Sequence, residues 1–451
     1  MTPLAVFLHA FGQRYDLPIS LALYLYAAGG VVVISFVMVV AFAGDKVGER
    51  ALDYPTWRVP LLDRLAASRV VRALGGVLGV LVLLASIVTG LFGTQDPNRN
   101  PSEYLVWIYF WAGFVILTGL VGNVWGWVNP FRALESLVRL AYNPRSGSLP
   151  ERLGVWPAAI LYYLFAAFEL ASGEANHPAV LASLTILYTL LTLCGALAFG
   201  ESWYRQVEVF SVLFDLIGHF SPIERTDQGF ALRPWGTGLL RGWGAGWDRV
   251  VFILLTLSSL AFDGLLATSF YQSLALDTSP LWINLGQLGS ALFRAASMLV
   301  LTLGFLVVFA VVMRLVIYFG YVRVEATPTV TAFALTLVPI ALVYNAAHNY
   351  SYLLVQSQYL FPLLSDPFGT GRPIAFTPNF ALAGAAVVWY VQVVLIVIGH
   401  VIAVYLSHMR AGERFRTAKN ALLSQYPMLL LMVGYTMTSL WILAQPTTRG
   451  G

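Results

Sequence analysis

Long apolar runs, separated by short loops that carry arginine, dominate the chain. A membrane-spanning helix needs about 20 mostly apolar residues, and open sheet edges are not tolerated in lipid. The runs of sufficient length are residues 20–43, 70–93, 104–124, 155–172, 179–200, 249–270, 291–320, 328–353, 383–406 and 421–443. The pattern therefore predicts an all-α integral membrane protein with about ten transmembrane helices.

The polar stretches between these runs are short, so the sequence predicts one polytopic membrane domain over residues 1–451. Residues 201–248 are expected to form a cytoplasmic loop. Within it, residues 206–220 are apolar but too short to cross, which favours an interfacial or re-entrant helix. Pro339 lies inside the eighth run and predicts a kink there.

The distribution of basic residues predicts the orientation. Most of the 26 Lys and Arg residues fall in the loops after helices one, three, five, seven and nine. Lys and Arg accumulate on the cytoplasmic side of membranes. An even number of spans then places both termini outside, which for a bacterial inner membrane means the periplasm.

Composition supports the membrane assignment and excludes several kinds of ligand and cofactor. Hydrophobic residues make up 58% of the chain and charged residues 11%, whereas soluble domains carry about 25% charged residues. The net charge of +4 resides in loop arginines, so it reports membrane topology and not nucleic-acid binding. Cys194 is the single cysteine, which excludes covalently attached haem c and cysteine-ligated iron–sulfur clusters.

Charged side chains inside the spans are the first candidates for function, because each costs roughly 2.5–3.5 kcal/mol at a helix centre. Asp263, His348, Glu169 and Arg294 are the candidate catalytic residues, on helices six, eight, four and seven. Their depths predict an outward-facing polar site. The structural alternative is that Asp263 or Glu169 forms an ion pair with Arg294 and that His348 bonds a carbonyl. Two further polar residues of helix eight are Asn345 and Asn349.

The histidines limit the cofactors. His400 and His348 are the candidate cofactor ligands, but straight helices would separate them in depth by about 20 Å, too far for the two axial ligands of one haem. His9, His348 and Asp263 are the candidate metal ligands. Haem b, quinone and a divalent metal all remain open.

Several motifs together resemble the integral membrane family called fenitrothion hydrolase. The segments that carry the resemblance are HAFGQRYDLP from residue 9, VGNVWGWVNPF from 121, FSVLFDLIGHFSPIE from 210, AFDGLLAT from 261, AHNYSYLLVQSQYLFPLLSDPFG from 347, WYVQ from 389 and WILAQP near the end. The resemblance implies hydrolysis of an organophosphate triester by a membrane-bound, hetero-oligomeric enzyme. The motif positions that carry over are His9, Asp16, Asn123, Asp263, His348, Asp366 and His400.

Three functions stay open at this point. The first is a multi-pass subunit of a larger respiratory or electron-transfer complex, with other membrane or periplasmic subunits as partners. The second is the phosphotriester hydrolase. The third is a secondary transporter with five plus five inverted helices, in which Gly29–Gly30 and Asp263–Gly264 would be corresponding helix breaks.

Overall fold

The computed structural model describes residues 15–43, 54–321, 324–371, 374–415 and 417–449. Helices account for most of this part of the chain, and its strands are all short, so the all-α fold is confirmed. The chain divides into two compact units, which are described separately. The first unit is Met1–Tyr54, Gly236–Leu354 and Asn379–Gly451; the second is Pro55–Trp235 and Val355–Pro378. The single membrane domain expected from the sequence stays a prediction.

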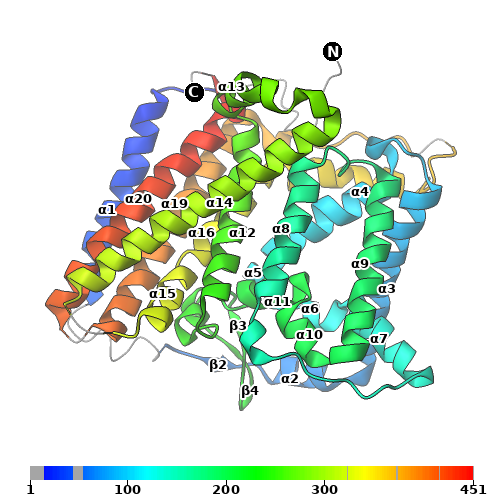
Figure 1. Cartoon of the computed structure of the whole chain (residues 1–451), viewed down its shortest axis with the longest axis horizontal. Helices are drawn as coiled ribbons and strands as arrows, with labels where there is room; N and C mark the ends of the chain where they lie inside the picture. Colours follow the sequence, from blue (N-terminus) through cyan, green and yellow to red (C-terminus); the bar gives the residue numbers. More distant parts are fainter. Residues whose placement is uncertain (1–14, 44–53, 322–323, 372–373, 416, 450–451) are drawn as a thin grey trace. The chain divides into compact units, whose positions relative to one another are not determined.

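The first unit is a bundle of long helices (Figure 1). They are α1 (Leu21–Ala43), α12 (Trp247–Leu266), α14 (Gly286–Phe319), α15 (Ala326–Leu335) followed by α16 (Val338–His348), α19 (Ala385–Arg414) and α20 (Ala418–Thr447). The shorter helices are α13 (Ser269–Thr278) and α17 (Tyr350–Leu354). Strand β1 (Tyr15–Asp16) pairs in parallel with β5 (Thr448–Arg449), so the two ends of the described chain lie together.

The α15–α16 segment is the interior of the first unit. In its most apolar window 83% of the residues are buried, and it packs against α12 and α19. The segment breaks at Thr336 and Leu337, and Pro339 occupies the first turn of α16. Proline lacks the N–H that a continuous helix would use there, so the predicted kink is confirmed.

The second unit contains shorter helices and a small sheet. Its helices are α2 (Pro60–Ala67), α3 (Arg69–Phe92), α4 (Pro101–Glu103), the π-helix η2 (Tyr104–Gly113), α5 (Phe114–Leu120), α6 (Trp125–Val128), α7 (Pro130–Ala141), α8 (Trp156–Ala171), α9 (Pro178–Phe199), α10 (Glu201–Gln206), α11 (Val209–Gly218) and α18 (Leu360–Leu363). Strands β2 (Trp57–Arg58), β4 (Gly229–Leu232) and β3 (Ile223–Thr226) pair antiparallel in that order.

Every apolar run of the sequence is helical, but one is short. Nine helical segments of the described chain are long and apolar enough to cross a membrane. Six belong to the first unit and three to the second. The remaining run is α8, whose 16 residues span about 24 Å. Gly154 and Gly173, both at positive φ, bound this helix and limit its length.

The segment 201–248 contains more structure than the expected loop with one helix. It includes α10, α11 and the β3–β4 hairpin. Seven of the ten residues of α11 are buried, among them Leu213, Phe214 and Leu216, and the helix packs against α5, α8 and α10. Burial on this scale favours a re-entrant type of helix over one that lies on the membrane surface.

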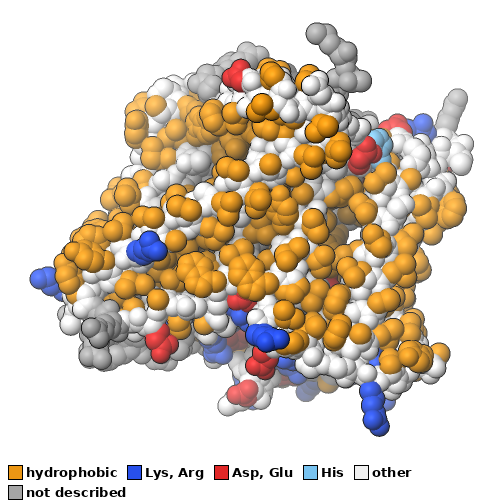
Figure 2. Space-filling view, in the orientation of Figure 1, with side chains coloured by type: hydrophobic (Ala, Val, Ile, Leu, Met, Phe, Trp, Pro, Cys, Tyr) orange, Lys and Arg blue, Asp and Glu red, His pale blue; other side chains and the backbone are white. Residues whose placement is uncertain are grey.

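Exposed apolar side chains cover the long helices. On α14 the exposed residues Val300, Leu303, Val307 and Val311 follow helical spacing along one face. Hydrophobic side chains cover most of the face shown in Figure 2, and most of its charged side chains lie near helix ends. A surface of this kind is stable against lipid and not against water, so the chain is a multi-pass membrane protein.

Candidate functional site

Asp263 and His348 meet near the ends of two packed helices in the first unit. Asp263 lies in the last turn of α12 and His348 is the last residue of α16. The Nε2 atom of His348 is 2.8 Å from Oδ2 of Asp263, with side-chain exposures of 4% and 22%. The carboxylate therefore accepts the Nε2 hydrogen and fixes the orientation of the imidazole ring. We call these two residues the Asp263–His348 pair.

Tyr344 lies beside this pair, one helical turn before His348. The two rings stack, with centroids 5.9 Å apart and planes at 12°. The Tyr344 hydroxyl is buried and has no hydrogen-bond partner among the described residues. It lies over Gly264, where an added Cβ would collide with the hydroxyl oxygen and with Ile442. Gly264 is thus required for close packing next to Asp263.

The expected helix breaks are absent. Asp263 and Gly264 lie within the continuous helix α12, and Gly29 and Gly30 lie within the continuous helix α1. A glycine in a membrane helix permits close approach of a neighbour without opening the backbone. The prediction of corresponding breaks at these positions is therefore wrong. Gly264 and Gly29 allow a neighbouring helix to pack closely, and Gly30 is helical with no neighbour near its Cβ position.

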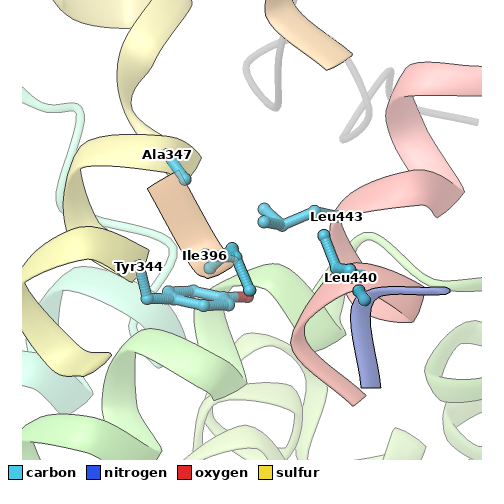
Figure 3. Packing of buried hydrophobic residues seen from close by; sticks show 6 residues of the cluster. Tyr344, Ala347, Ile396, Leu440 and Leu443 are labelled. Carbon is cyan, nitrogen blue, oxygen red and sulfur yellow. The ribbon is translucent and has the colours of Figure 1, made fainter. Parts of the chain in front are cut away.

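An apolar cluster lies behind Tyr344. Figure 3 shows the Tyr344 ring beside Ile396, with Leu440 and Leu443 across from it. Next to the Asp263–His348 pair, the side-chain amide of Gln392 on α19 donates to the carbonyl of Ala347, the residue before His348, over 3.2 Å. The pair is therefore supported by α19 and α20 as well as by its own two helices.

His400 does not reach the Asp263–His348 pair. Gln392 bonds the carbonyl next to His348, and His400 follows eight residues later on α19, about 12 Å further along the axis. Gly399, next to His400, packs against Val343, which precedes His348 by five residues on α16. A Cβ added to Gly399 would collide with the Val343 side chain. His348 and His400 thus lie at different levels along α19, and the expectation that they do not ligate one haem stays a prediction.

His400 has its own arrangement. It is fully buried, and its Nδ1 lies 2.8 Å from the Ile396 carbonyl oxygen, so Nδ1 carries the hydrogen. Nε2 then presents its lone pair and has no partner in the described part of the chain. A nitrogen held in this way has the tautomer of a metal or haem ligand.

Arg294 lies on a different helix from either member of the Asp263–His348 pair. It lies on α14 near Tyr271, whose pKa is raised by burial and lowered by the Arg294 charge. The contact described for Asp263 is with His348, a different residue from the Arg294 that the sequence suggested as its partner. Glu169 belongs to α8 of the second unit.

The remaining candidates have other placements. His9 lies outside the described residues. Asn349 donates from its amide to the side-chain oxygen of Asn345 over 3.0 Å, one turn before the end of α16. Within the described ranges, no group of three or more His, Cys, Asp and Glu side chains is arranged to hold a metal ion.

Two neighbours of the pair escaped the sequence interpretation. Tyr344 precedes His348 by four residues, a spacing that places both rings on one helix face, so the signal was present. Gln392 belongs to the WYVQ segment but carries no charge, and hydropathy gives such a residue little weight.

No family model, curated protein or solved structure matches the chain. The resemblance to the fenitrothion hydrolase family therefore stays a prediction based on motif residues. Some of these residues have structural roles. Asp366 accepts the backbone N–H groups of Thr370 and Gly371 and closes a turn, and Asn123 packs against Gly218 of α11.

Proposed function

We propose that the protein is a subunit of a larger membrane complex of the respiratory or electron-transfer type, in which the Asp263–His348 pair binds and releases a proton. The pair itself carries this proposal. Ionisable side chains inside membrane helices are rare, and proton transfer is one of their main uses. Histidine is the side chain best suited to exchange a proton near neutral pH.

The surroundings of the pair support proton exchange. His348 is almost fully buried, whereas the Asp263 side chain is 22% exposed, so the carboxylate is the group that a proton reaches first. The buried Tyr344 hydroxyl adds a further donor and acceptor beside the ring. A buried hydroxyl without a protein partner favours a water molecule or a bound ligand as its partner.

The test is made on the complex purified from native membranes in mild detergent. We expect further subunits to copurify, and absorbance in the Soret region would identify haem b among the cofactors. Asp263→Asn and His348→Gln should each reduce proton-coupled turnover at least about tenfold, which is roughly 1.4 kcal/mol in the barrier. A chain that purifies alone, or unchanged turnover in both variants, would contradict the proposal.

His177 is the matched control. It also contacts a carboxylate, with Nδ1 2.6 Å from Oε2 of Glu174, but both side chains are exposed. His177→Gln removes the same chemistry from a solvated loop, so turnover should stay at the wild-type level. Equal losses at His177 and His348 would indicate a general effect of histidine removal.

The orientation in a bacterial inner membrane, with both termini in the periplasm, belongs to the same proposal. Two exposed positions of the second unit test it, Asn98 before α4 and Ser148 before α8. In a Cys194→Ala background, Asn98→Cys should react with an impermeant thiol reagent added from the periplasm, and Ser148→Cys should not. The reverse result would invert the orientation.

Phosphotriester hydrolysis is the second candidate, favoured by the motif resemblance and by one contact. A carboxylate that fixes an imidazole, as Asp263 fixes His348, is a common arrangement for a general base that activates water. The purified protein should then release the phenol from an aryl phosphotriester, and His348→Gln should abolish this release. Release that persists in the variant would exclude the pair as the base.

A secondary transporter has less support. It rested on five plus five helices and on two corresponding breaks. The compact units instead contain six and three of the long segments, with α8 in the second unit, and the breaks are not formed. Substrate uptake into proteoliposomes would restore this alternative.

A further inference from the structure

Glu103 is a buried carboxyl group of the second unit that plays no part in the Asp263–His348 pair. It begins the span formed by α4, η2 and α5. Glu103 is 7% exposed, and Ser102 beside it is fully buried. Because burial of a carboxylate in a membrane protein is costly, such a residue requires an explanation.

The carboxyl group lacks the partners that would stabilise a negative charge. Its Oε1 atom accepts no hydrogen bond, and in the described part of the chain no basic side chain is within ion-pair distance. Among the described residues, the Trp107 indole is the one side chain that acts on it as a donor, and the same N–H also bonds the Ala175 carbonyl over 3.1 Å. One shared donor does not replace the hydration of a carboxylate.

Apolar and aromatic side chains pack around Trp107, the indole next to this group. Trp107, one turn after Glu103, lies 5.8 Å from Phe165 and 6.4 Å from Phe168 between ring centroids. It also packs with Ala175 and Leu181 in one buried cluster. Trp107 belongs to η2, a π-helix, and π-helical turns occur frequently at functional sites.

A capping role does not account for Glu103. Asn100 and Glu103 have the spacing of a capping box. However, the Asn100 side chain itself accepts the Ser102 N–H at 2.9 Å and also donates to the Thr89 and Thr94 carbonyls. The start of the span is thus already capped, and Glu103 Oε1 is left without a donor.

Glu208 shows what a structural carboxylate of this unit looks like. It is 1% exposed and accepts hydrogen bonds from the Phe210 and Ser211 backbone N–H groups, from the Tyr188 hydroxyl at 2.7 Å and from the Trp125 indole. Four donors stabilise the charged form. Glu103 has the same burial without them, so its surroundings favour the neutral acid.

We propose that Glu103 is a proton-binding site of the second unit: a neutral, exchangeable carboxylic acid that gives up its proton when a base reaches its unpartnered oxygen. The fully buried Ser102 hydroxyl, also without a partner in the described residues, is next to it in the chain and available to the same exchange. The other titratable groups of this neighbourhood are Tyr104, Tyr359 and Asp96, which interact electrostatically around Tyr104 together with Glu103. The site is proposed for a proton because the carboxyl group has no basic partner among the described residues.

The test is labelling of the folded protein with dicyclohexylcarbodiimide, a hydrophobic reagent that adds to protonated carboxyl groups in apolar surroundings. Peptide mass spectrometry should find the adduct on Glu103 and much less on Glu208, because four hydrogen-bond donors stabilise the Glu208 carboxylate in its charged form. Labelling of Glu103 should fall as the pH rises. Equal labelling of both residues would overturn the proposal.

Infrared difference spectroscopy provides a measurement that needs no reagent. The C=O stretch of a neutral carboxylic acid, sensitive to exchange into D₂O, should be present in the wild type and missing in Glu103→Gln, while Glu208→Gln keeps it. Glu103→Gln keeps the volume and should retain its thermal transition. Absence of the band in the wild type would overturn the proposal. Protection of Glu103 by Na⁺ at constant pH would do the same, because it would assign the site to a metal cation.

Discussion

Each unit contains an ion pair with nearly the same distance between its charged groups. The two pairs differ in the basic residue, which is arginine in one and histidine in the other. In the second unit, Arg233 and Glu224 approach to 2.7 Å at exposures of 5% and 4%. In the first unit, His348 and Asp263 approach to 2.8 Å at exposures of 4% and 22%. Arginine stays charged at every physiological pH, whereas histidine exchanges its proton. The same distance therefore joins a permanent ion pair in the second unit, whereas in the first unit it joins the two residues for which we propose proton exchange.

The partners of the basic residues sharpen this difference. Arg233 also donates to the carbonyls of Ser221, Gly218 and His219, so it ties the end of α11 to the β3–β4 hairpin. His348 instead stacks on Tyr344, whose hydroxyl is unpartnered in the described chain. Burial alone therefore does not distinguish the two pairs, and the proposal for the Asp263–His348 pair depends on the ability of histidine to exchange a proton.

The largest loss of stability is expected for Arg233→Met. The change leaves Glu224 as a buried carboxylate without its cation, and breaking a buried pair in this way costs about 3–5 kcal/mol. The thermal transition in detergent, followed by circular dichroism, measures the loss. The double variant with Glu224→Leu should recover a large part of it. If Arg233→Met were as stable as wild type, the Arg233–Glu224 pair would not be the structural link that distinguishes it from the Asp263–His348 pair.

A smaller loss is expected for Gly264→Ala. The new methyl group would collide with the Tyr344 hydroxyl and Ile442, and overpacking of a tight interface costs about 1–3 kcal/mol. Gly304→Ala on α14 is the matched control, because no atom lies within 4 Å of its Cβ position. Thermal unfolding should separate the two variants, with Gly304→Ala at or slightly above wild type.

Asp263→Asn should cost about 1 kcal/mol, because the amide oxygen still accepts the Nε2 hydrogen of His348. Proton-coupled turnover should nevertheless be lost. Adding Arg294→Gln should rescue nothing, since the contact described for Asp263 is with His348. Thermal unfolding and turnover of the single and double variants test this, and a large stability loss that the double variant recovers would return Asp263 to a structural role.

The smallest effect is expected at an exposed pair, Arg132 and Glu201, 2.7 Å apart with side-chain exposures of 36% and 51%. Hydrogen bonds from Arg132 lower the pKa of Glu201 below its unfolded value of 4.5. The contribution to stability is therefore present above pH 4.5 and lost as the pH falls through the lower folded pKa. Glu201→Gln should change the unfolding free energy at pH 7 by less than about 1 kcal/mol and weaken its acid dependence.

The sequence named both members of the Asp263–His348 pair among its candidates but did not join them. Charge inside an apolar run identified Asp263, His348, Glu169 and Arg294. The sequence offered Arg294 as the partner of Asp263 because both carry charge on consecutive spans. The structure joins Asp263 to His348, on helices that are not consecutive, and leaves Glu169 in the other unit. Glu103 stayed unnoticed because it sits at the edge of its apolar run, where a charge is ordinary.

The sequence by itself determined the class of the protein and the position of its apolar helices. In lipid each segment must satisfy its own backbone hydrogen bonds, so helix formation follows from the length and apolarity of each run alone. Only the tertiary structure decided the division into two units, the pairing of Asp263 with His348 and the burial of Glu103. These depend on which helices approach closely, and that choice is made by side-chain packing, as at Gly264 against Tyr344, which hydropathy does not record.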